Sequence, residues 1–296
     1  MPRRRIRSRF FAALTASSLL AACGSVPPGP EQGPAFALMG DTPYDDSQVP
    51  RLDALVQGLN REPLAFVAHV GDITSGRGPC TDEWFMARKA QFDRIRAPFF
   101  LLPGDNDWTD CHRSGFDPLE RLAKWRSLFC LPEKSLPPLR VERQAGPCCE
   151  HVRWTFERTL FVALNVQGTN NNLGRTPAMD EEYRERMERV FAWIDDSEKA
   201  LVERRLDALV LLMQADPFLA PRSGESGFAS LLERLGRLAA AHPGRVTLVH
   251  GDSHVHRDDF PLPGLHRVEV WGSPFVSWLR GRIASGGLDA EVAGQY

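Results

Sequence analysis

Short apolar runs alternate with polar loops and longer amphipathic segments along most of the chain. The runs have the length of buried strands and end at Gly or at polar residues, as expected for an α/β sheet. The sequence predicts strands at residues 35–39, 64–70, 98–102, 209–213 and 246–249, with residues 267–271 as the last strand, and a hairpin of residues 154–156 and 160–166.

Segments with apolar residues at helical spacing separate these strands. In the longest segment, Met187, Val190, Phe191 and Ile194 fall on one face, which predicts an amphipathic helix. The alternation of strands and helices predicts an α/β fold. Helices are predicted at residues 49–60, 82–94, 228–241 and from 179 to beyond 206.

Acidic or polar motifs follow directly after five of the predicted strands. Any one Gly-Asp pair is explained equally well by a turn or a helix cap. Five in order are not, because loops at the carboxyl ends of strands in an open α/β sheet converge on one ligand site. The motifs are Gly40-Asp41, Gly71-Asp72, Gly104-Asp105-Asn106-Asp107, Gln214-Ala215-Asp216-Pro217 and His250-Gly251-Asp252-Ser253-His254-Val255-His256.

The order of these motifs resembles the signature of the calcineurin-like metallophosphoesterase superfamily, which runs D-x-H, G-D, G-N-H-D/E, a lone His and G-H-x-H. The resemblance covers residues 35–256. It implies a four-layer αββα sandwich, two metal ions bridged by the aspartate of the second motif, and hydrolysis of phosphate esters. It assigns Asp41, Asp72 and His254, which match the family directly, to one ion.

Several family positions hold a different residue in this chain. Pro43 stands where the first motif has its His and cannot ligate through a side chain. Besides the bridging aspartate, the second ion is assigned to Asp105, Gln214 and Asp252, which replace Asn, His and His but still offer oxygen donors. Asn106 stands at the position of the catalytic His, and it becomes a metal ligand instead if the loop is shifted by one residue.

This implied donor set contains one imidazole and several oxygens. Hard oxygen donors suit Mg, Ca or Mn, whereas nitrogen-rich sites suit Zn or Fe. One or two divalent ions are therefore expected, with Mg or Mn favoured and Zn, Fe and Ca as alternatives. Clustered carboxylates also repel one another strongly without a cation. Asp107 and Asp216 are alternative donors, although turn or capping roles explain them equally well.

Asn106 and His256 are the candidate catalytic residues. His256 is a candidate to orient a phosphate oxygen, to act as a general acid or to supply a missing ligand, although a single His in a loop is more often a surface or packing residue. His112 is a weaker candidate for the acid. His69, inside a predicted strand, is interpreted as a core histidine or as a support for the ligands.

Two functions of different kinds stay open. The first is a metal-dependent hydrolase of phosphate mono- or diesters, in which water attacks phosphorus in line. The second is a catalytically impaired protein of the same fold that binds a metal, a phosphate group or a partner, because four histidine positions of the family signature are changed. A purely structural role explains the acidic strand ends less well.

The beginning of the chain predicts export. Five arginines precede a short apolar run, and small residues end at Cys23, which resembles the signal peptide and lipobox of bacterial lipoproteins. An ordinary signal peptide is the alternative. Residues 1–22 are assigned to the signal peptide, residues 23–34 to the lipidated cysteine and a Pro/Gly-rich tether, and residues 35–296 to the metallophosphoesterase domain.

Location and charge narrow the expected partners. The residue after Cys23 is Gly24 rather than aspartate, which by analogy favours the outer membrane of the cell envelope, facing the periplasm. Without the five signal arginines, 31 Lys and Arg stand against 38 Asp and Glu, which disfavours nonspecific nucleic-acid binding. A phosphorylated small molecule or envelope substrate is the expected partner, the membrane is contacted through the lipid anchor only, and the oligomeric state is left open.

Five cysteines remain besides the lipobox cysteine, and an oxidising compartment permits disulfides. Cys80 and Cys111 follow the second and third acidic motifs and are expected to pair. Cys130 is expected to pair with Cys148 or Cys149, and the odd number leaves one thiol free. A cysteine metal site is disfavoured because the sequence has no CxxC or Cys/His spacing.

Overall fold

Three parallel strands that carry the first three acidic motifs belong to a five-stranded sheet. They are β1 (Ala35–Met39), β2 (Leu64–His69) and β3 (Phe99–Leu101), which lie side by side. β11 (Ser277–Ala284) pairs antiparallel with β1, and β12 (Gly287–Gln295) pairs antiparallel with β11. Because β1, β2 and β3 run in the same direction, their carboxyl ends lie at one edge of the sheet.

The second sheet has seven strands, in the order β4-β5-β6-β7-β8-β10-β9. β6, β7, β8 and β10 are parallel. β9 pairs antiparallel with β10 at one edge, and β4 pairs antiparallel with β5 at the other. β5 also pairs antiparallel with β6, as the predicted hairpin requires. The strands are β4 (Val141–Arg143), β5 (Val152–Phe156), β6 (Thr159–Ala163), β7 (Ala208–Leu212), β8 (Val246–His250), β9 (Arg257–Leu262) and β10 (Leu265–Glu269).

Side-chain caps start two of the main helices at defined residues. Thr81 accepts a hydrogen bond from the backbone N–H of Trp84 at 3.2 Å, and Thr176 accepts one from Met179 at 3.2 Å. α5 ends earlier than predicted, and Arg205 just beyond it has a left-handed φ of 52°. The helices are α1 (Val49–Leu59), α2 (Asp82–Phe92), α3 (Pro118–Phe129), α4 (Gly168–Asn171), α5 (Pro177–Glu203) and α6 (Ala229–Ala241), with a 3₁₀ helix at Thr109–Ser114.

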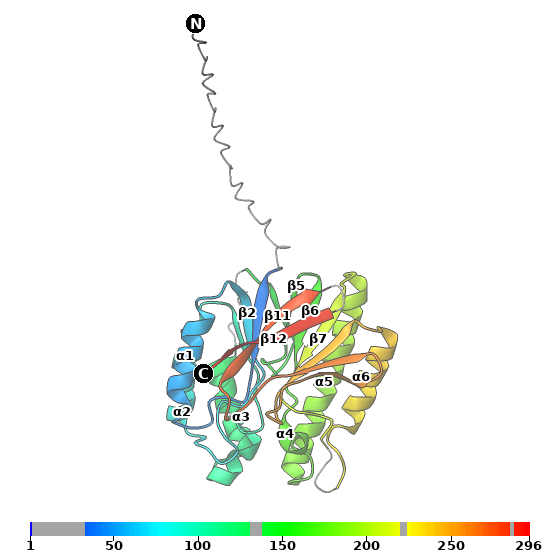
Figure 1. Cartoon of the computed structure of the whole chain (residues 1–296). Helices are drawn as coiled ribbons and strands as arrows, with labels where there is room; N and C mark the ends of the chain where they lie inside the picture. Colours follow the sequence, from blue (N-terminus) through cyan, green and yellow to red (C-terminus); the bar gives the residue numbers. More distant parts are fainter. Residues whose placement is uncertain (2–32, 131–137, 220–223, 285–286) are drawn as a thin grey trace. The chain divides into compact units, whose positions relative to one another are not determined.

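Three hydrophobic clusters fill the spaces between four layers. One packs α1 and α2 against the first sheet, one lies between the two sheets, and one packs α5 and α6 against the second sheet. Figure 1 shows the same arrangement, with α1 and α2 on one side of the strands and α5 and α6 on the other. The predicted four-layer αββα sandwich is confirmed.

Phe66 lies at the centre of the cluster between the sheets. Its ring stacks on Phe36 with centroids 4.6 Å apart, and it meets Phe100, Trp154 and Phe161 edge-on. Each such pair contributes about 0.5–1.5 kcal/mol beyond the area that it buries. These contacts hold the sheet with the first three motifs against the sheet with the last two.

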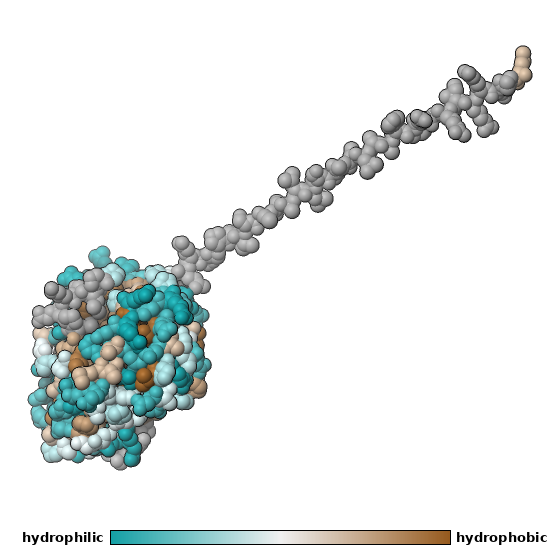
Figure 2. Space-filling model, turned by 90° about the vertical axis from the view of Figure 1, so that its left-hand side faces the viewer, coloured by the Kyte–Doolittle hydropathy of each residue, from teal (hydrophilic) through white to brown (hydrophobic). Residues whose placement is uncertain are grey.

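The computed structural model describes Met1 and residues 33–130, 138–219, 224–284 and 287–296, and Gly33–Tyr296 forms one compact unit. The predicted signal peptide, the lipidated Cys23 and most of the tether lie outside the described residues. Within the described part, no helix has both the length and the hydrophobicity needed to cross a bilayer. Figure 2, which views the left-hand side of Figure 1, shows a mainly hydrophilic surface with small separate hydrophobic patches.

The prediction that residues 267–271 form the last strand is wrong. That strand is β10, and the ribbon of β11 and β12 follows it and completes the first sheet. Arg280 and Arg282 interrupt the apolar pattern of β11, and Arg280 forms an ion pair with Glu62 at 2.8 Å. A ribbon near a sheet edge with one face toward water lacks the continuous apolar run that marks the buried strands. The sequence also gave no prediction for α3, β4 and β9.

Two disulfides are present. The predicted Cys80–Cys111 bridge joins the loop after β2 to the 3₁₀ helix after β3. Cys130 pairs with Cys149, which leaves Cys148 as a buried free thiol, and burial raises the pKa of that thiol to about 11. The first bridge therefore ties together two of the loops that carry acidic motifs.

Candidate metal centre

All five predicted motifs meet where the parallel strands of the two sheets end. The backbone N–H of Asp252, after β8, donates to Asp41 Oδ1, after β1, at 3.1 Å. The Asn106 side chain, after β3, donates to Asp72 Oδ2, after β2, at 2.7 Å. Gln214 Nε2, after β7, lies 3.3 Å from the same Asp72 oxygen. These hydrogen bonds connect the loop after β1 with the loop after β8, and the loop after β2 with the loops after β3 and β7.

Asp72 is the centre of this cluster. Besides the contacts with Asn106 and Gln214, its Oδ2 accepts a hydrogen bond from Tyr44 Oη at 3.0 Å, and its Oδ1 accepts one from the Asn106 backbone at 3.0 Å. A Cβ at Gly104 would overlap Asp72 Oδ1, so the third motif needs glycine at this position. Asp72 therefore lies where a carboxylate that bridges two ions would be expected.

Asp41 and His254 lie together on one side of Asp72. His254 Nε2 is 3.8 Å from Asp41 Oδ1 and 2.7 Å from Tyr44 Oη. Glycines permit this close approach, because a Cβ at Gly251 would overlap Asp41 Oδ2 and one at Gly272 would lie 2.7 Å from His254 Cδ2. The fifth motif thus reaches the first through its glycine.

Asp105 and Asp252 converge on the start of α4. A Cβ at Gly168 would lie 2.7 Å from Asp252 Oδ1 and 2.8 Å from Asp105 Oδ2. Thr169 Oγ1 donates to Asp105 Oδ2 at 2.5 Å, and the Asp216 backbone N–H donates to Asp252 Oδ2 at 3.0 Å. The loop after β6 therefore forms one wall of the site.

Four of the predicted ligands have a left-handed backbone that is uncommon for residues with a Cβ. The φ angles are 50° at Asp41, 61° at Asp72, 79° at Asp252 and 64° at His254. Such conformations cost of order 1–3 kcal/mol each and are concentrated at functional sites, where the surrounding structure enforces them. The backbone of this fold is therefore strained at the residues that the motifs identify.

Asp107 holds two of these loops together. Its carboxylate accepts hydrogen bonds from the backbone N–H groups of Asp72 at 3.0 Å, Ile73 at 2.8 Å and Gly104 at 2.8 Å. Burial raises its pKa to about 7. Both oxygens already have backbone partners, so Asp107 positions the neighbouring donors.

The electrostatics of the cluster fit a bound cation. Burial raises the pKa values of Asp41, Asp72 and Asp252 well above their usual range, and neighbouring carboxylates raise them further. Within the described part of the chain, the one ion-pair partner of these three carboxylates is His254. Burial also lowers the pKa of His254, which favours the neutral imidazole that binds metals. Buried carboxylates without a Lys or Arg partner, beside a neutral imidazole, are a donor set that suits a divalent ion.

The cluster opens into a cavity of about 750 Å³. Arg113 and Arg175 line this cavity. Arg113 forms an ion pair with Asp110 at 2.6 Å, and Arg175 donates a hydrogen bond to the carbonyl of Thr109 at 2.6 Å. Acidic, cationic and apolar groups therefore face the same space, as in sites for small polar ligands. Apolar wall residues are Leu173, Leu219 and Phe228.

Three histidines named from the sequence do not join the ligand cluster. His256 Nδ1 lies 2.7 Å from the carbonyl of Glu269, and His256 is not among the residues that line the cavity. His69 is fully buried with Nε2 2.9 Å from the carbonyl of Thr42, and burial lowers its pKa to about 4, in keeping with a core histidine. His112 Nδ1 lies 2.9 Å from the carbonyl of Thr109.

Several residues of the site were missed from the sequence, among them Tyr44, Arg113, Thr169 and Arg175. Tyr44 directly follows Pro43, so a search for a donor beside the lost histidine position would have found it. Arg113, Thr169 and Arg175 lie outside the strand-end motifs, and no pattern in the sequence points to them.

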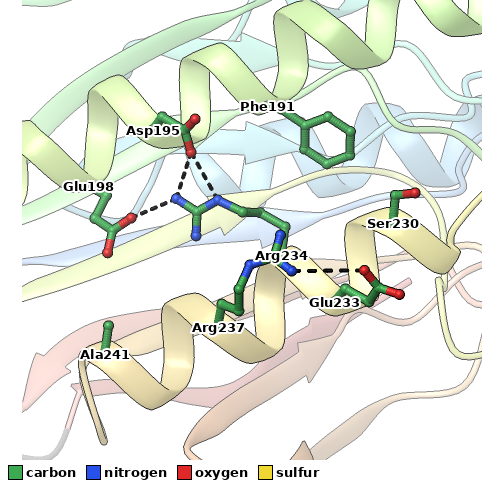
Figure 3. Close-up of a pocket in the computed structure, with 8 residues that line it drawn as sticks. All are labelled: Phe191, Asp195, Glu198, Ser230, Glu233, Arg234, Arg237 and Ala241. Carbon is green, nitrogen blue, oxygen red and sulfur yellow. Dashed lines mark hydrogen bonds and ion pairs between the residues drawn. The ribbon is translucent and has the colours of Figure 1, made fainter.

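A second hollow, of about 540 Å³, lies between α5 and α6 and shares no residue with the first. Figure 3 shows its central guanidinium, Arg234, bound to Asp195 at 2.7 Å and to Glu198 at 2.6 Å. Because these carboxylates already have a cationic partner, the hollow lacks the unpaired acidic groups of the strand-end cluster.

The fold is similar to that of a dimetal phosphatase from Danio rerio, with a TM-score of 0.56 and 13% identity over 89% of this chain and 97% of that one. A purple acid phosphatase from yellow lupin gives a TM-score of 0.44 and 15% identity, over 90% of this chain and 47% of that one. A 5'-nucleotidase from Candida albicans gives a TM-score of 0.40 and 13% identity, over 84% of this chain and 48% of that one. This chain spans about half the length of those two proteins. No protein-family model and no curated protein matches the sequence. The layers, the strand-end cluster and the first of these similarities together show that the chain has the calcineurin-like metallophosphoesterase fold.

Proposed function

We propose that the protein is a metal-dependent hydrolase of phosphate mono- or diesters that acts in the cell envelope. The observation that carries this proposal is the convergence of Asp41, Asp72, Asp105 and Asp252 with His254 beside one cavity. Among the described residues, no Lys or Arg forms an ion pair with any of these four carboxylates. A phosphatase-type fold agrees with this chemistry.

The donors form two sets that share Asp72. Asp41 and His254 would hold one ion, and the loops with Asp105 and Asp252 would hold the other. Gln214 turns its amide nitrogen toward Asp72, and its Oε1 accepts a hydrogen bond from the Gly168 N–H at 2.6 Å, so in this arrangement it positions the site and does not offer the oxygen expected from the sequence. Divalent ions bound there, with Mg or Mn favoured, would neutralise negative charge on phosphate oxygens and act as Lewis acids. The role of the chain itself would be to fix these donors in place, on a backbone with left-handed φ angles at Asp41, Asp72, Asp252 and His254.

Other cavity residues indicate how a substrate would be held. The guanidinium groups of Arg113 and Arg175 are suited to bind phosphate oxygens. Asn106 cannot act as a general acid, because a carboxamide does not give up a proton, and its Nδ2 is engaged by Asp72. We therefore expect esters with good leaving groups to be hydrolysed fastest.

The test uses purified protein without residues 1–23, made metal-free and then supplied with Mg, Mn, Ca or Zn. Hydrolysis of p-nitrophenyl phosphate or of its bis-ester is expected with at least one metal, and Asp72→Asn is expected to abolish it. Glu233→Gln, in the second hollow, removes an exposed carboxylate and serves as the matched control that retains activity. Equal activity of Asp72→Asn and the unsubstituted protein would overturn the proposal.

A binding module is the second candidate function. It is favoured by the amide at the acid position and by the placement of His256 away from the cavity. Metal uptake measured by calorimetry, combined with no turnover of either ester, would support this candidate over the enzyme.

Location needs a separate experiment, because the lipobox lies outside the described residues. We propose that Cys23 carries the lipid anchor. Full-length protein expressed in a bacterium should incorporate labelled palmitate and sediment with membranes, and Cys23→Ala should lose both properties. Labelling that persists in Cys23→Ala would refute the assignment.

A further inference from the structure

We propose that Arg186 of α5 is a positioning residue for the metal centre, because its guanidinium holds the loop after β6 that sets Asp105 in place. The proposal rests on the metal centre proposed above. It adds a residue that belongs neither to the strand-end motifs nor to the residues that line the cavity. Arg186 is buried, with 2% of its surface exposed.

The loop after β6 has a backbone that needs support from outside. Four consecutive residues have left-handed φ angles, which are 47° at Thr169, 53° at Asn170, 55° at Asn171 and 71° at Asn172. Residues with a Cβ adopt this conformation singly rather than in runs, and a β-branched residue such as Thr169 adopts it least readily. Contacts from elsewhere in the fold must therefore keep this segment in its conformation.

Arg186 makes such contacts at two points of the loop. Its Nη1 donates to Asn171 Oδ1 at 2.7 Å and to the carbonyl of Asn165 at 3.0 Å, and its Nη2 donates to the carbonyl of Asn171 at 2.9 Å. Glu182, one turn earlier in α5, accepts from Arg186 Nε at 2.6 Å and from the Asn172 side chain at 2.9 Å. Because a planar guanidinium presents its donors at fixed angles, the loop is tied to α5 in a defined position.

The same loop contacts the third acidic motif and the residues after it. Thr169 Oγ1 donates to Asp105 Oδ2 at 2.5 Å, and it lies 3.1 Å from Asp110 Oδ2. The Asp110 backbone N–H in turn donates to the carbonyl of Asp105 at 2.9 Å. The position of the loop therefore sets the direction of the Asp105 carboxylate.

The alternative is that Arg186 only stabilises the packing of α5, as a buried partner of Glu182. Arg153 on β5 is a residue of that kind, because it lies over the Trp193 ring at 4.3 Å and pairs with Glu142 of β4 at 2.9 Å. Arg186 differs from it by donating to two backbone carbonyls of the loop that contacts Asp105. It thus fixes the path of that loop.

Metal titration of Arg186→Lys tests the proposal. Lysine keeps the positive charge beside Glu182 but cannot reproduce the planar fork of donors. Calorimetry should show the dissociation constant of Mn²⁺ raised at least about tenfold relative to the unsubstituted protein, as loss of a group that orients a ligand typically gives. Arg153→Lys is the matched control, since it makes the same change at a buried arginine whose partners hold no candidate ligand, and it should leave Mn²⁺ affinity unchanged. Urea unfolding of both variants separates loss of stability from loss of affinity.

A double-mutant cycle shows whether Arg186 acts through the loop. Thr169→Val removes the hydroxyl group that contacts Asp105 and should also weaken Mn²⁺ binding. If Arg186 acts through Thr169, the doubly substituted protein should bind Mn²⁺ no more weakly than the weaker of the two single variants. Losses that add in the double variant would overturn the positioning role.

Asn171→Gly gives the same test from the side of the loop if Arg186→Lys does not fold. Glycine accepts the left-handed backbone and removes the Oδ1 acceptor of Arg186, so Mn²⁺ binding should again weaken. Unchanged Mn²⁺ binding by Arg186→Lys, or by Asn171→Gly in its place, would overturn the role of Arg186 and leave the metal centre intact. Absence of metal uptake by the unsubstituted protein would overturn both.

Discussion

At the scale of single residues, the site depends on glycines as much as on carboxylates. A Cβ at Gly251 would overlap Asp41 Oδ2, so Gly251→Ala should displace Asp41 and weaken metal binding at least about tenfold, within the range for loss of a supporting group. Calorimetric titration with Mn²⁺ measures this effect.

Gly236→Ala is the control, because Gly236 in α6 has open space around its Cα. This substitution should leave metal binding unchanged and raise the free energy of unfolding by about 0.5–1 kcal/mol. Equal metal affinity in both variants would contradict the geometry.

Glu142 on β4 allows a prediction about pH. Hydrogen bonds from Arg204 and Arg153 lower its pKa from 4.5 to about 2. Because the pKa is lower in the folded state, the carboxylate stabilises the protein above pH 4.5, and this contribution is lost as the pH falls toward 2. Glu142→Gln should therefore reduce the free energy of unfolding at pH 7 by about 1 kcal/mol, given its partial contact with water.

Urea unfolding at a series of pH values measures this difference between the two proteins. The difference should shrink steadily between pH 4.5 and 2. A difference that stays constant over that range would show that packing, rather than charge, accounts for the effect of the substitution.

At the scale of elements, the sequence predicted those strands that are buried on both faces. β1, β2, β7 and β8 are continuous apolar runs, and their predicted positions agree with the structure to within one or two residues. β11 and β12 were missed, because Arg280 and Arg282 on a partly solvated ribbon remove that signal. Thr169 itself was missed because its contact with Asp105 is made only in three dimensions.

The packing between the two sheets also allows a prediction about the stability of the fold. Phe66 is fully buried between β1, β3, β5 and β6, so Phe66→Ala should lower the free energy of unfolding by about 3–5 kcal/mol. Phe260→Ala, at a side chain that is 67% exposed, should change it by less than about 0.5 kcal/mol. Chemical denaturation of the two variants makes the comparison. Similar losses in both would mean that the aromatic cluster does not hold the sheets together.

At the scale of the whole molecule, the candidate site exists because two sheets bring their strand ends to one place. The order of the motifs predicted this convergence, since parallel strands share an edge. The positions of Tyr44, Arg113 and Arg175 depend on side-chain directions that no periodicity encodes. The Cys80–Cys111 bridge fastens together the loops after β2 and β3, which are neighbours in the first sheet.

Removal of that bridge should therefore affect both stability and metal binding. The pair Cys80→Ser and Cys111→Ser opens a link between residues 31 apart, which should lower the free energy of unfolding by about 2–4 kcal/mol. It should also weaken Mn²⁺ binding, because Asp72 and Asn106 lie in the loops that it frees.

The pair Cys130→Ser and Cys149→Ser is the matched control, because it removes the disulfide that joins α3 to the loop before β5. This pair should lower stability and leave metal affinity unchanged. Equal weakening of metal binding by both pairs would indicate a general loss of structure instead of release of the site loops.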